Sequence, residues 1–301
     1  MNVFHVLDLA QAKFLAVTTP SRNASVMKFT FHDGFSVRRL GFGAMRLTGW
    51  RRPATDESKA VARRAVELGV TFIDTADAYD LGLNEELLAE ALHPYPQDLL
   101  IATKVGHTRP SRGEWVPLGR PEYLRQQAEL SLRRLRAERL GLLQLHRLDP
   151  KVPLPDQIGA LKELKDEGKI ARIGLSEVSV AQLDQAREIT PIDSVQNRYN
   201  LTDRASDDVL ASCEQGGIAF VPWLPIANGG HARAEGLLGK IAADLGATPA
   251  QVSLAWLLRK SAVIIPIPGT SSKEHLEENC GAADVTLSDE QFRALTDATT
   301  S

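Results

Sequence analysis

The feature that most constrains the fold is a repeated alternation of short apolar runs with segments of helical periodicity, which begins near Arg39. This alternation is typical of parallel βα units, in which each strand is followed by a helix that packs back on the sheet. The predicted strands cover residues 39–42, 71–74, 99–104, 140–145, 169–175, 194–196, 218–221 and 262–265. The predicted helices cover residues 55–68, 84–92, 121–135, 155–167, 179–188, 204–215, 237–245, 249–260 and 272–280. Because each of the eight strands feeds a helix, the sequence predicts an α/β fold of the (β/α)₈ barrel type.

An open doubly wound sheet is the alternative architecture, and it carries a nucleotide site after its first strand. That site needs the pattern G-x-G-x-x-G leading directly into a helix. Here the stretch from Gly41 to Arg46 supplies only two of the glycines, and residues 48–53 intervene before any predicted helix. A tight turn at the end of a barrel strand therefore explains these glycines better.

Further elements flank the predicted barrel. Residues 29–31 and 35–37 predict a short N-terminal β-hairpin that covers the bottom of the barrel. At the other end of the chain, Ser288 and Gln291 form the capping box of a last helix. The barrel domain is therefore expected to span residues 27–301. Residues 1–26 lack the pattern of a signal peptide and are expected to form a loosely ordered extension.

Charge and cysteine content restrict the classes of partner and the compartment. The chain has 35 Lys and Arg against 38 Asp and Glu, with both signs interspersed. This balance gives no reason to expect a nucleic acid or an acidic membrane as partner. No segment has the ~18–20 apolar residues that a membrane-spanning helix needs. Cys213 and Cys280 lie in separate predicted helices without metal-type spacing, which fits buried thiols in a reducing cytoplasm.

Polar side chains occur where the predicted strands end. Asp74, Lys104, His146, Ser176 and Gln196 each follow an apolar run. Taken singly, each has an ordinary structural explanation, such as a turn cap, a solvated strand end or a histidine near the core. The carboxyl ends of barrel strands all meet at one mouth, however, and chemistry in such barrels is located there. The sequence therefore predicts that these side chains converge on one site.

A phenol completes the predicted site, because Tyr79 follows Asp74 by five residues. A free tyrosine has a pKa of about 10, which is high for a proton donor near neutral pH. We expect the neighbouring Lys104 ammonium to lower the pKa of Tyr79, and Asp74 to hold that ammonium in place. His146 is then placed to donate a hydrogen bond to a carbonyl oxygen.

This set of side chains suits the protonation of a carbonyl group. The sequence shows neither a metal-binding cluster nor a serine in a nucleophile elbow. Carbonyl protonation leads to reduction only when a hydride is supplied from elsewhere, and nicotinamides are the cofactors that supply one. The expected metal content is therefore none, and the expected cofactor is a nicotinamide dinucleotide.

Several motifs in order resemble the aldo-keto reductase superfamily. They are residues 72–79, 101–104, 142–146, 174–176 and 266–271, with Glu278 and Asn279. The resemblance runs from about Phe29 to Asp297 and implies the family's (β/α)₈ barrel and carbonyl reductase activity. It also implies that the family's catalytic Asp, Tyr, Lys and His correspond to Asp74, Tyr79, Lys104 and His146.

The resemblance also implies where the cofactor binds. Ser176 and Gln196 match contacts to the nicotinamide carboxamide, although Glu177 stands where an Asn usually follows that Ser. Trp223 matches the aromatic ring that stacks on the nicotinamide, and the loop 224–230 matches the segment that holds the pyrophosphate. The remaining implied contacts are Leu224, Pro225 and Ile226 in that loop, Gly269, Thr270, Ser271 and Ser272 at the adenosine 2′-phosphate, and Glu278 and Asn279 at the adenine.

The phosphate-binding residues of the family differ here in two ways. Gly269 replaces a Lys, in a Gly-Thr-Ser version of the loop that resembles bacterial members, and His275 aligns with an Arg. Hydroxyls, backbone N–H groups at a helix start and an imidazole can still bind a phosphate. NADPH is therefore expected as cofactor, with NADH as the alternative.

The substrate pocket is expected to be formed by Met45, Arg46, Trp115 and Arg147. The chain ends soon after the helix that begins at Ser288, without the long C-terminal loop of many mammalian-type members, which predicts an open site. The expected partner is a small carbonyl compound, and the expected state is a monomer or a weak homo-oligomer. Two alternatives stay open: a pyridoxal reductase, and a nucleotide-sensing subunit of a larger assembly.

Overall fold

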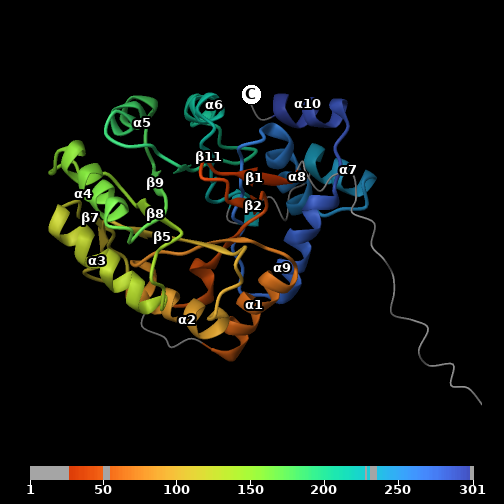
Figure 1. Cartoon of the computed structure of the whole chain (residues 1–301). Coiled ribbons are helices and arrows are strands. Elements are labelled where there is room, and N and C mark those ends of the chain that lie inside the picture. The colour runs from red at the N-terminus through yellow and green to blue at the C-terminus, as the bar shows by residue number, and fades with distance from the viewer. Residues whose placement is uncertain (1–26, 50–54, 228, 231–235, 299–301) are drawn as a thin grey trace, which may run out of the picture.

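The computed structural model of the chain describes residues 27–49, 55–227, 229–230 and 236–298. The expected N-terminal extension, residues 1–26, lies outside the described residues. The strands of the central sheet are β3 (Phe42–Gly43), β4 (Phe72–Asp74), β5 (Leu100–Val105), β8 (Leu142–Leu145), β9 (Ile173–Ser176), β10 (Ser194–Gln196) and β11 (Ala219–Phe220). They are parallel, lie in the order β11-β10-β9-β8-β5-β4-β3, and curl around a common axis (Figure 1).

The backbone of residues 263–269 occupies the eighth position and joins the two edges of this sheet. Ile264 forms a parallel bridge with Phe220 on one side, and Gly269 forms one with Gly43 on the other. Pro266 and Pro268 lack the N–H group that a regular strand donates. The predicted strand 262–265 is therefore wrong as a regular strand, but the predicted (β/α)₈ barrel is confirmed.

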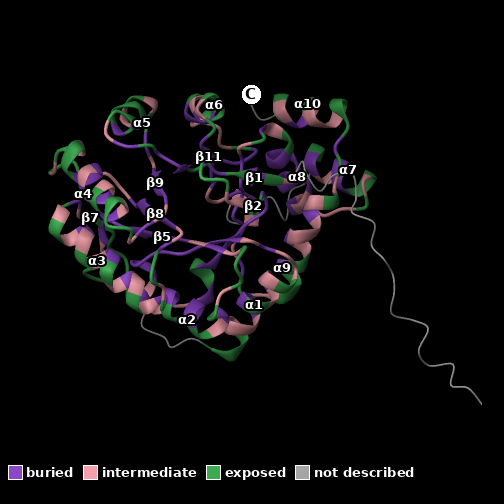
Figure 2. Ribbon diagram, in the orientation of Figure 1, coloured by how far each residue is buried: buried purple, intermediate pink, exposed green. Residues whose placement is uncertain are grey.

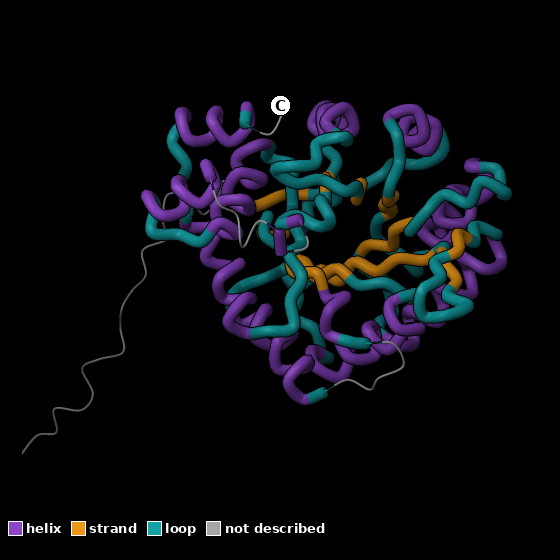
Figure 3. The backbone as a smooth tube through the Cα atoms, turned by 180° about the vertical axis from the view of Figure 1, so that it is seen from behind, coloured by secondary structure: helices purple, strands orange, loops and turns teal. Residues whose placement is uncertain are grey.

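Helices cover the outer face of the sheet, as the view from behind shows (Figure 3). The α-helices are α1 (Asp56–Glu67), α2 (Leu83–Leu92), α3 (Pro121–Arg134), α4 (Leu154–Asp166), α5 (Val180–Arg187), α6 (Asp207–Gly216), α7 (Gly236–Asp244), α8 (Pro249–Lys260), α9 (Lys273–Cys280) and α10 (Asp289–Asp297). Short 3-10 helices are η1 (Ala44–Leu47), η2 (Tyr79–Gly82) and η4 (Gly281–Asp284). The predicted capping box of the last helix is confirmed, because Ser288 and Gln291 cap each other's backbone N–H groups.

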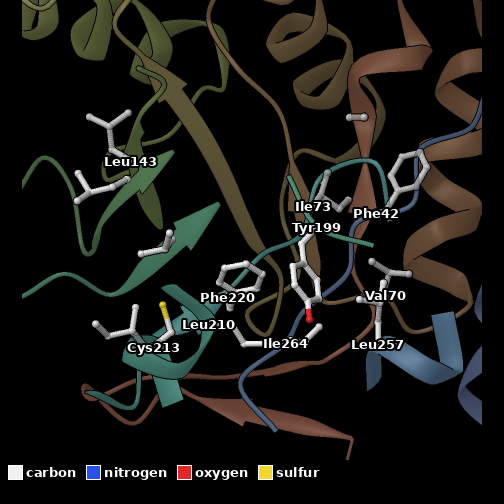
Figure 4. Packing of buried hydrophobic residues seen from close by; sticks show 14 of the residues in the cluster. Phe42, Val70, Ile73, Leu143, Tyr199, Leu210, Cys213, Phe220, Leu257 and Ile264 are labelled. Atoms are coloured by element: carbon white, nitrogen blue, oxygen red, sulfur yellow. The ribbon is translucent and has the colours of Figure 1, made fainter. Parts of the chain in front are cut away.

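Two hydrophobic layers hold the barrel together, and buried residues follow the strands (Figure 2). The outer layer lies between strands and helices and includes Ile73, Tyr199 and Phe220 (Figure 4). The neighbouring strand residues point the other way, because side chains alternate along a strand, and they fill the barrel interior. The N-terminal hairpin of β1 (Lys28–Thr30) and β2 (Ser36–Arg38) pairs Phe29 with Val37 and adds both side chains to this inner layer.

A second hairpin, which the sequence did not predict, follows β5. Its strands are β6 (His107–Thr108) and β7 (Val116–Pro117), and His107 pairs with Pro117. The residues between the two strands include Arg109 and Trp115. This hairpin carries Trp115 to the mouth of the barrel.

Candidate active site

A buried ion pair forms the centre of the candidate site. The Nζ atom of Lys104 lies 2.6 Å from Oδ2 of Asp74, 2.8 Å from the carbonyl oxygen of Thr75 and 3.0 Å from the hydroxyl oxygen of Tyr79. These groups come from the ends of β4 and β5 and from the loop after β4. Lys104 is fully buried, so its ammonium depends on these oxygen atoms in place of water.

The second oxygen of Asp74 is also satisfied. Its Oδ1 atom accepts hydrogen bonds from Nε2 of Gln196 (2.8 Å) and Nε2 of Gln144 (3.2 Å). Both glutamines lie on barrel strands, at the end of β10 and within β8. The orientation of the carboxylate is thus fixed from two sides, which in turn fixes the position of the Lys104 ammonium beside Tyr79.

The electrostatics of this group favour a charged Lys104. Burial acts to lower the pKa of Lys104, but the Asp74 carboxylate and the Tyr79 phenol outweigh it, and the pKa is raised. The pKa of Tyr79 is also raised, because burial outweighs the opposing effect of the Lys104 ammonium. The expectation of a lowered Tyr79 pKa is therefore wrong in net direction. The ammonium limits a rise that burial causes, and Tyr79 stays protonated.

His146 lies beside Tyr79 as a neutral imidazole. The two rings meet edge to face with centroids 5.9 Å apart. Burial, reinforced by the charge of Lys104, holds the pKa of His146 well below its usual value. A neutral imidazole has one N–H donor, so it can donate a hydrogen bond to a carbonyl oxygen without adding a charge.

The loop that carries Tyr79 is held in a strained conformation. The residues after it, Asp80 and Leu81, have φ values of 51° and 62°, in a region that side chains other than glycine rarely adopt. Thr48 donates a hydrogen bond of 2.5 Å to the Asp80 carboxylate, and buried Asn84 joins the carbonyl of Ala44 to the hydroxyl of Thr75. These contacts with the β3 loop compensate for the strain and position the phenol.

One cavity of about 1230 Å³ opens over this centre. Most of the predicted site residues line it. The lining residues are Asp74, Tyr79, His146, Ser176, Gln196, Trp223, Leu224, Pro225, Ile226, Gly269, Thr270, His275, Glu278, Asn279, Met45, Arg46, Trp115 and Arg147. The predicted residues that do not line it are Lys104, which is buried behind Asp74 and Tyr79, and Ser271 and Ser272. The structure thus brings the predicted catalytic, cofactor and substrate residues together around a single space.

Glu177 joins the ends of three neighbouring barrel strands. Its Oε1 atom accepts a hydrogen bond of 2.5 Å from Nε1 of Trp223 and one of 2.6 Å from the backbone N–H of Arg198. Glu177 adopts a left-handed conformation with φ 56°. Its carboxylate therefore fixes the orientation of the indole ring, and the adjacent Ser176 accepts a hydrogen bond from Arg147 (2.9 Å).

The loop after β11 and the start of α9 also line the cavity. In the loop after β11, Leu224 and Ala227 have φ values of 53° and 48°. The Ala227 N–H donates to the carbonyl of Leu224 and the Gly229 N–H to that of Ile226, which closes this loop into tight turns. At the start of α9, the Ser272 hydroxyl caps the backbone N–H of His275. Asn228, within the loop predicted to hold a pyrophosphate, lies outside the described residues.

The β6–β7 hairpin carries one side chain that the sequence analysis missed, His107, beside the predicted pocket residue Trp115. His107 is buried in the mouth, with its ring centroid 4.4 Å from that of His146. Trp115 lies edge to face with Tyr79 at 6.2 Å. A signal existed in the sequence, because His107 follows Lys104 by only three residues and thus also lies near a strand end.

The structure adds two negative findings. Among the described residues, no group of His, Cys, Asp and Glu side chains is arranged to hold a metal ion. None of the helices in the described ranges has the length and apolar character needed to cross a membrane.

The chain is similar to known proteins over most of its length. The profile of the Aldo/keto reductase family matches residues 39–299. An uncharacterized oxidoreductase of Schizosaccharomyces pombe is 47% identical over 263 residues, which cover 86% of each chain. Pyridoxine 4-dehydrogenase of Escherichia coli is 40% identical over 271 residues, covering 86% of this chain and 94% of that protein. The structure of an aldo-keto reductase from Klebsiella pneumoniae in complex with NADPH superimposes with a TM-score of 0.76 at 28% identity, over 90% of this chain and 95% of that one.

Proposed function

Because the chain belongs to the aldo/keto reductase family, we propose that Tyr79 is the proton donor in an NADPH-dependent reduction of aldehydes or ketones to alcohols. The observation that carries this assignment is the distance of 3.0 Å between the Tyr79 hydroxyl and the Lys104 ammonium, in a group that Asp74 completes. Membership of the family makes the protein an oxidoreductase. The roles of the individual residues are what we propose here.

The residues present fit a nicotinamide dinucleotide. Asn279 is buried at the cavity wall, and its side-chain amide makes no hydrogen bond with any residue that the structure describes. The amide oxygen of Gln196 is likewise without a partner in the described ranges. When bound, the nicotinamide supplies the hydride. We assign the nicotinamide end to Ser176, Gln196 and Trp223, and the adenosine end to residues 269–272, His275, Glu278 and Asn279.

The chain's own residues then carry out the proton transfer. His146 donates a hydrogen bond that holds the carbonyl oxygen next to the Tyr79 hydroxyl. Tyr79 gives its proton to that oxygen, and the Lys104 ammonium stabilises the tyrosinate that remains. Asp74 keeps Lys104 charged throughout, and a proton from solvent restores the phenol after the alcohol leaves.

The direct test is the consumption of NADPH by the purified protein, followed at its absorbance band, with a panel of aldehydes, α-dicarbonyls and pyridoxal. We expect turnover with at least one class. Pyridoxal is included because a relative at 40% identity is a pyridoxine 4-dehydrogenase and because aromatic rings line the mouth. Absence of turnover with tight NADPH binding would instead favour a nucleotide-sensing subunit.

The raised pKa of Tyr79 predicts the pH dependence. Reduction needs the protonated phenol, and a pKa above the usual 10.0 keeps it protonated through mildly alkaline pH. His146 does not titrate in this range, because its pKa lies well below 6.5. We therefore expect kcat/KM for the carbonyl to stay level up to about pH 9 and to decline only above the usual pKa of about 10. A decline centred near neutral pH would contradict this assignment.

His275 is proposed to contact the adenosine 2′-phosphate. It lines the cavity in the first turn of α9, where backbone N–H groups also favour an anion. Changing His275 to Ala should raise the Kd of NADPH about tenfold, since each 1.4 kcal/mol changes a Kd by that factor. The Kd of NADH, which has no 2′-phosphate, serves as the control and should hardly change in the same fluorescence titration. Equal weakening of both cofactors would remove His275 from this role.

The cysteines and the cavity bear on the compartment and on the oligomeric state of the protein. We propose a reducing compartment, the cytoplasm, because Cys213 and Cys280 are both free. We also propose that the protein acts as a monomer or a weak homo-oligomer, since the cavity is formed by side chains of one chain.

A further inference from the structure

Two histidines that are far apart along the chain lie side by side in the mouth of the barrel. His107 begins β6 and His146 follows β8, and both are 6% exposed. Their ring centroids are 4.4 Å apart with an interplanar angle of 60°. The proposed mechanism uses His146 at the carbonyl oxygen and leaves His107 without a role.

The ring nitrogens of these histidines lack partners. The Nδ1 atoms of both are buried without a hydrogen bond. None of the other residues that the structure describes donates to or accepts from either imidazole. The Nδ1 atoms are closed off from the cavity, but the Nε2 atoms are not, and they too have no hydrogen-bond partner among the described residues. A ligand in the cavity, which both rings line, can therefore hydrogen-bond the Nε2 atoms.

The charge state of His107 determines what it can bind. Burial, with the nearby charges of Arg147 and Arg109, lowers the pKa of His107 to about 4. The ring is therefore neutral at physiological pH, and its accessible Nε2 atom presents a donor or an acceptor according to which nitrogen carries the proton. Such a ring selects a neutral hydroxyl or carbonyl oxygen by hydrogen bonding, whereas it offers no charge to attract a carboxylate or phosphate.

The surroundings hold both rings in place. The Trp115 ring meets His107 and His146 edge to face at 5.6 Å and 5.8 Å. The Arg109 guanidinium lies 3.6 Å from the centre of the Trp115 ring, and it donates to the carbonyl oxygens of Ala78 and Glu114. Because the two imidazoles are in contact, their nitrogens can reach only oxygens that are close neighbours in a substrate.

We propose that His107 is a second substrate-binding residue, which hydrogen-bonds an oxygen on the carbon next to the reacting carbonyl while His146 binds the carbonyl oxygen itself. The substrate class is then α-oxygenated carbonyl compounds, namely α-hydroxy aldehydes, α-hydroxy ketones and α-dicarbonyls. This inference rests on the proposed function, because it places the reacting carbonyl at His146 and Tyr79.

The test compares lactaldehyde with propanal, which lacks only the hydroxyl on the neighbouring carbon. For each protein the quantity measured is the ratio of kcat/KM for lactaldehyde to that for propanal, with NADPH consumption as readout. We expect the wild type to prefer lactaldehyde. His107→Phe keeps a ring but removes both nitrogens, and it should lower the ratio about tenfold, as expected for one lost hydrogen bond.

Three further variants make the result specific. His107→Gln restores a donor and an acceptor and should recover much of the preference. His107→Leu repeats the test without an aromatic ring and replaces the Phe variant should that one not fold. His32→Phe makes the same change on the N-terminal hairpin, outside the cavity, and should keep the wild-type ratio.

The outcomes separate the two proposals. A ratio that is unchanged in His107→Phe or His107→Leu, or a wild-type preference for propanal, overturns the role of His107 and leaves the carbonyl reductase assignment standing. If the wild type consumes NADPH with neither these aldehydes nor any member of the wider carbonyl panel, the proposed function fails and this inference fails with it.

Discussion

Replacing Tyr79 with Phe is expected to lower kcat/KM for carbonyl reduction by about 10²- to 10⁴-fold, the usual contribution of a positioned proton donor. The substitution removes only the hydroxyl that lies 3.0 Å from Lys104. The ring stays, and with it the edge-to-face contacts to His146 and Trp115. The loss should therefore appear in the chemical step, while the Kd of NADPH measured by fluorescence titration stays close to the wild-type value.

Tyr95→Phe is the matched control for this experiment. The Tyr95 hydroxyl donates to the backbone carbonyl of Leu135 at 2.6 Å, and Tyr95 does not line the cavity. Its loss should reduce the stability slightly and leave turnover unchanged. Full activity of Tyr79→Phe would refute the assignment of the proton donor, and comparable losses in both variants would point to a general effect on folding.

The second large effect is expected for Lys104→Met, in both activity and stability. The ammonium is fully buried and pairs with Asp74 at 2.6 Å. Removing one partner of a buried pair typically costs about 3–5 kcal/mol, because the other charge is left unpaired. In a protein of this size we expect Tm to fall by about 5–8 °C. Reduction should be lost, because the tyrosinate that forms at Tyr79 would face no cation.

A double variant separates the two effects of this change. Combining Lys104→Met with Asp74→Asn removes both charges, so the double variant should melt at a higher temperature than Lys104→Met alone. Its activity should not return, because the cation beside Tyr79 is still missing. A double variant less stable than the single one would mean that Asp74 stabilises the fold through Gln144 and Gln196 more than through Lys104.

The sequence predicted the barrel and the assembly of the candidate site for a physical reason. In a parallel barrel all strands end at one mouth, so residues far apart along the chain, such as Asp74, Lys104 and Gln196, must meet there. Their positions are determined by the apolar runs before them, which are visible without a structure. The same reasoning predicted most strands and helices to within a few residues.

The features that the sequence could not predict depend on how close separate parts of the folded chain lie to one another. The β6–β7 hairpin is formed by two very short strands with no apolar alternation, so His107 was missed. The net direction of the Tyr79 pKa shift depends on how far burial exceeds the effect of Lys104, and burial is a property of the folded chain. The role of Glu177 depends on its contact with Trp223, 46 residues further along the chain.

The irregular eighth position of the barrel couples its closure to the cavity. The two edges of the sheet are joined here by isolated bridges in place of a continuous ladder, and this junction includes Gly43 and Gly269. Both glycines also line the cavity, so a molecule that fills the cavity contacts both sides of the junction. A ligand that binds only the closed ring adds its binding free energy to the stability of the whole barrel. We therefore expect the melting temperature of the protein to rise with the concentration of a cofactor that binds this cavity.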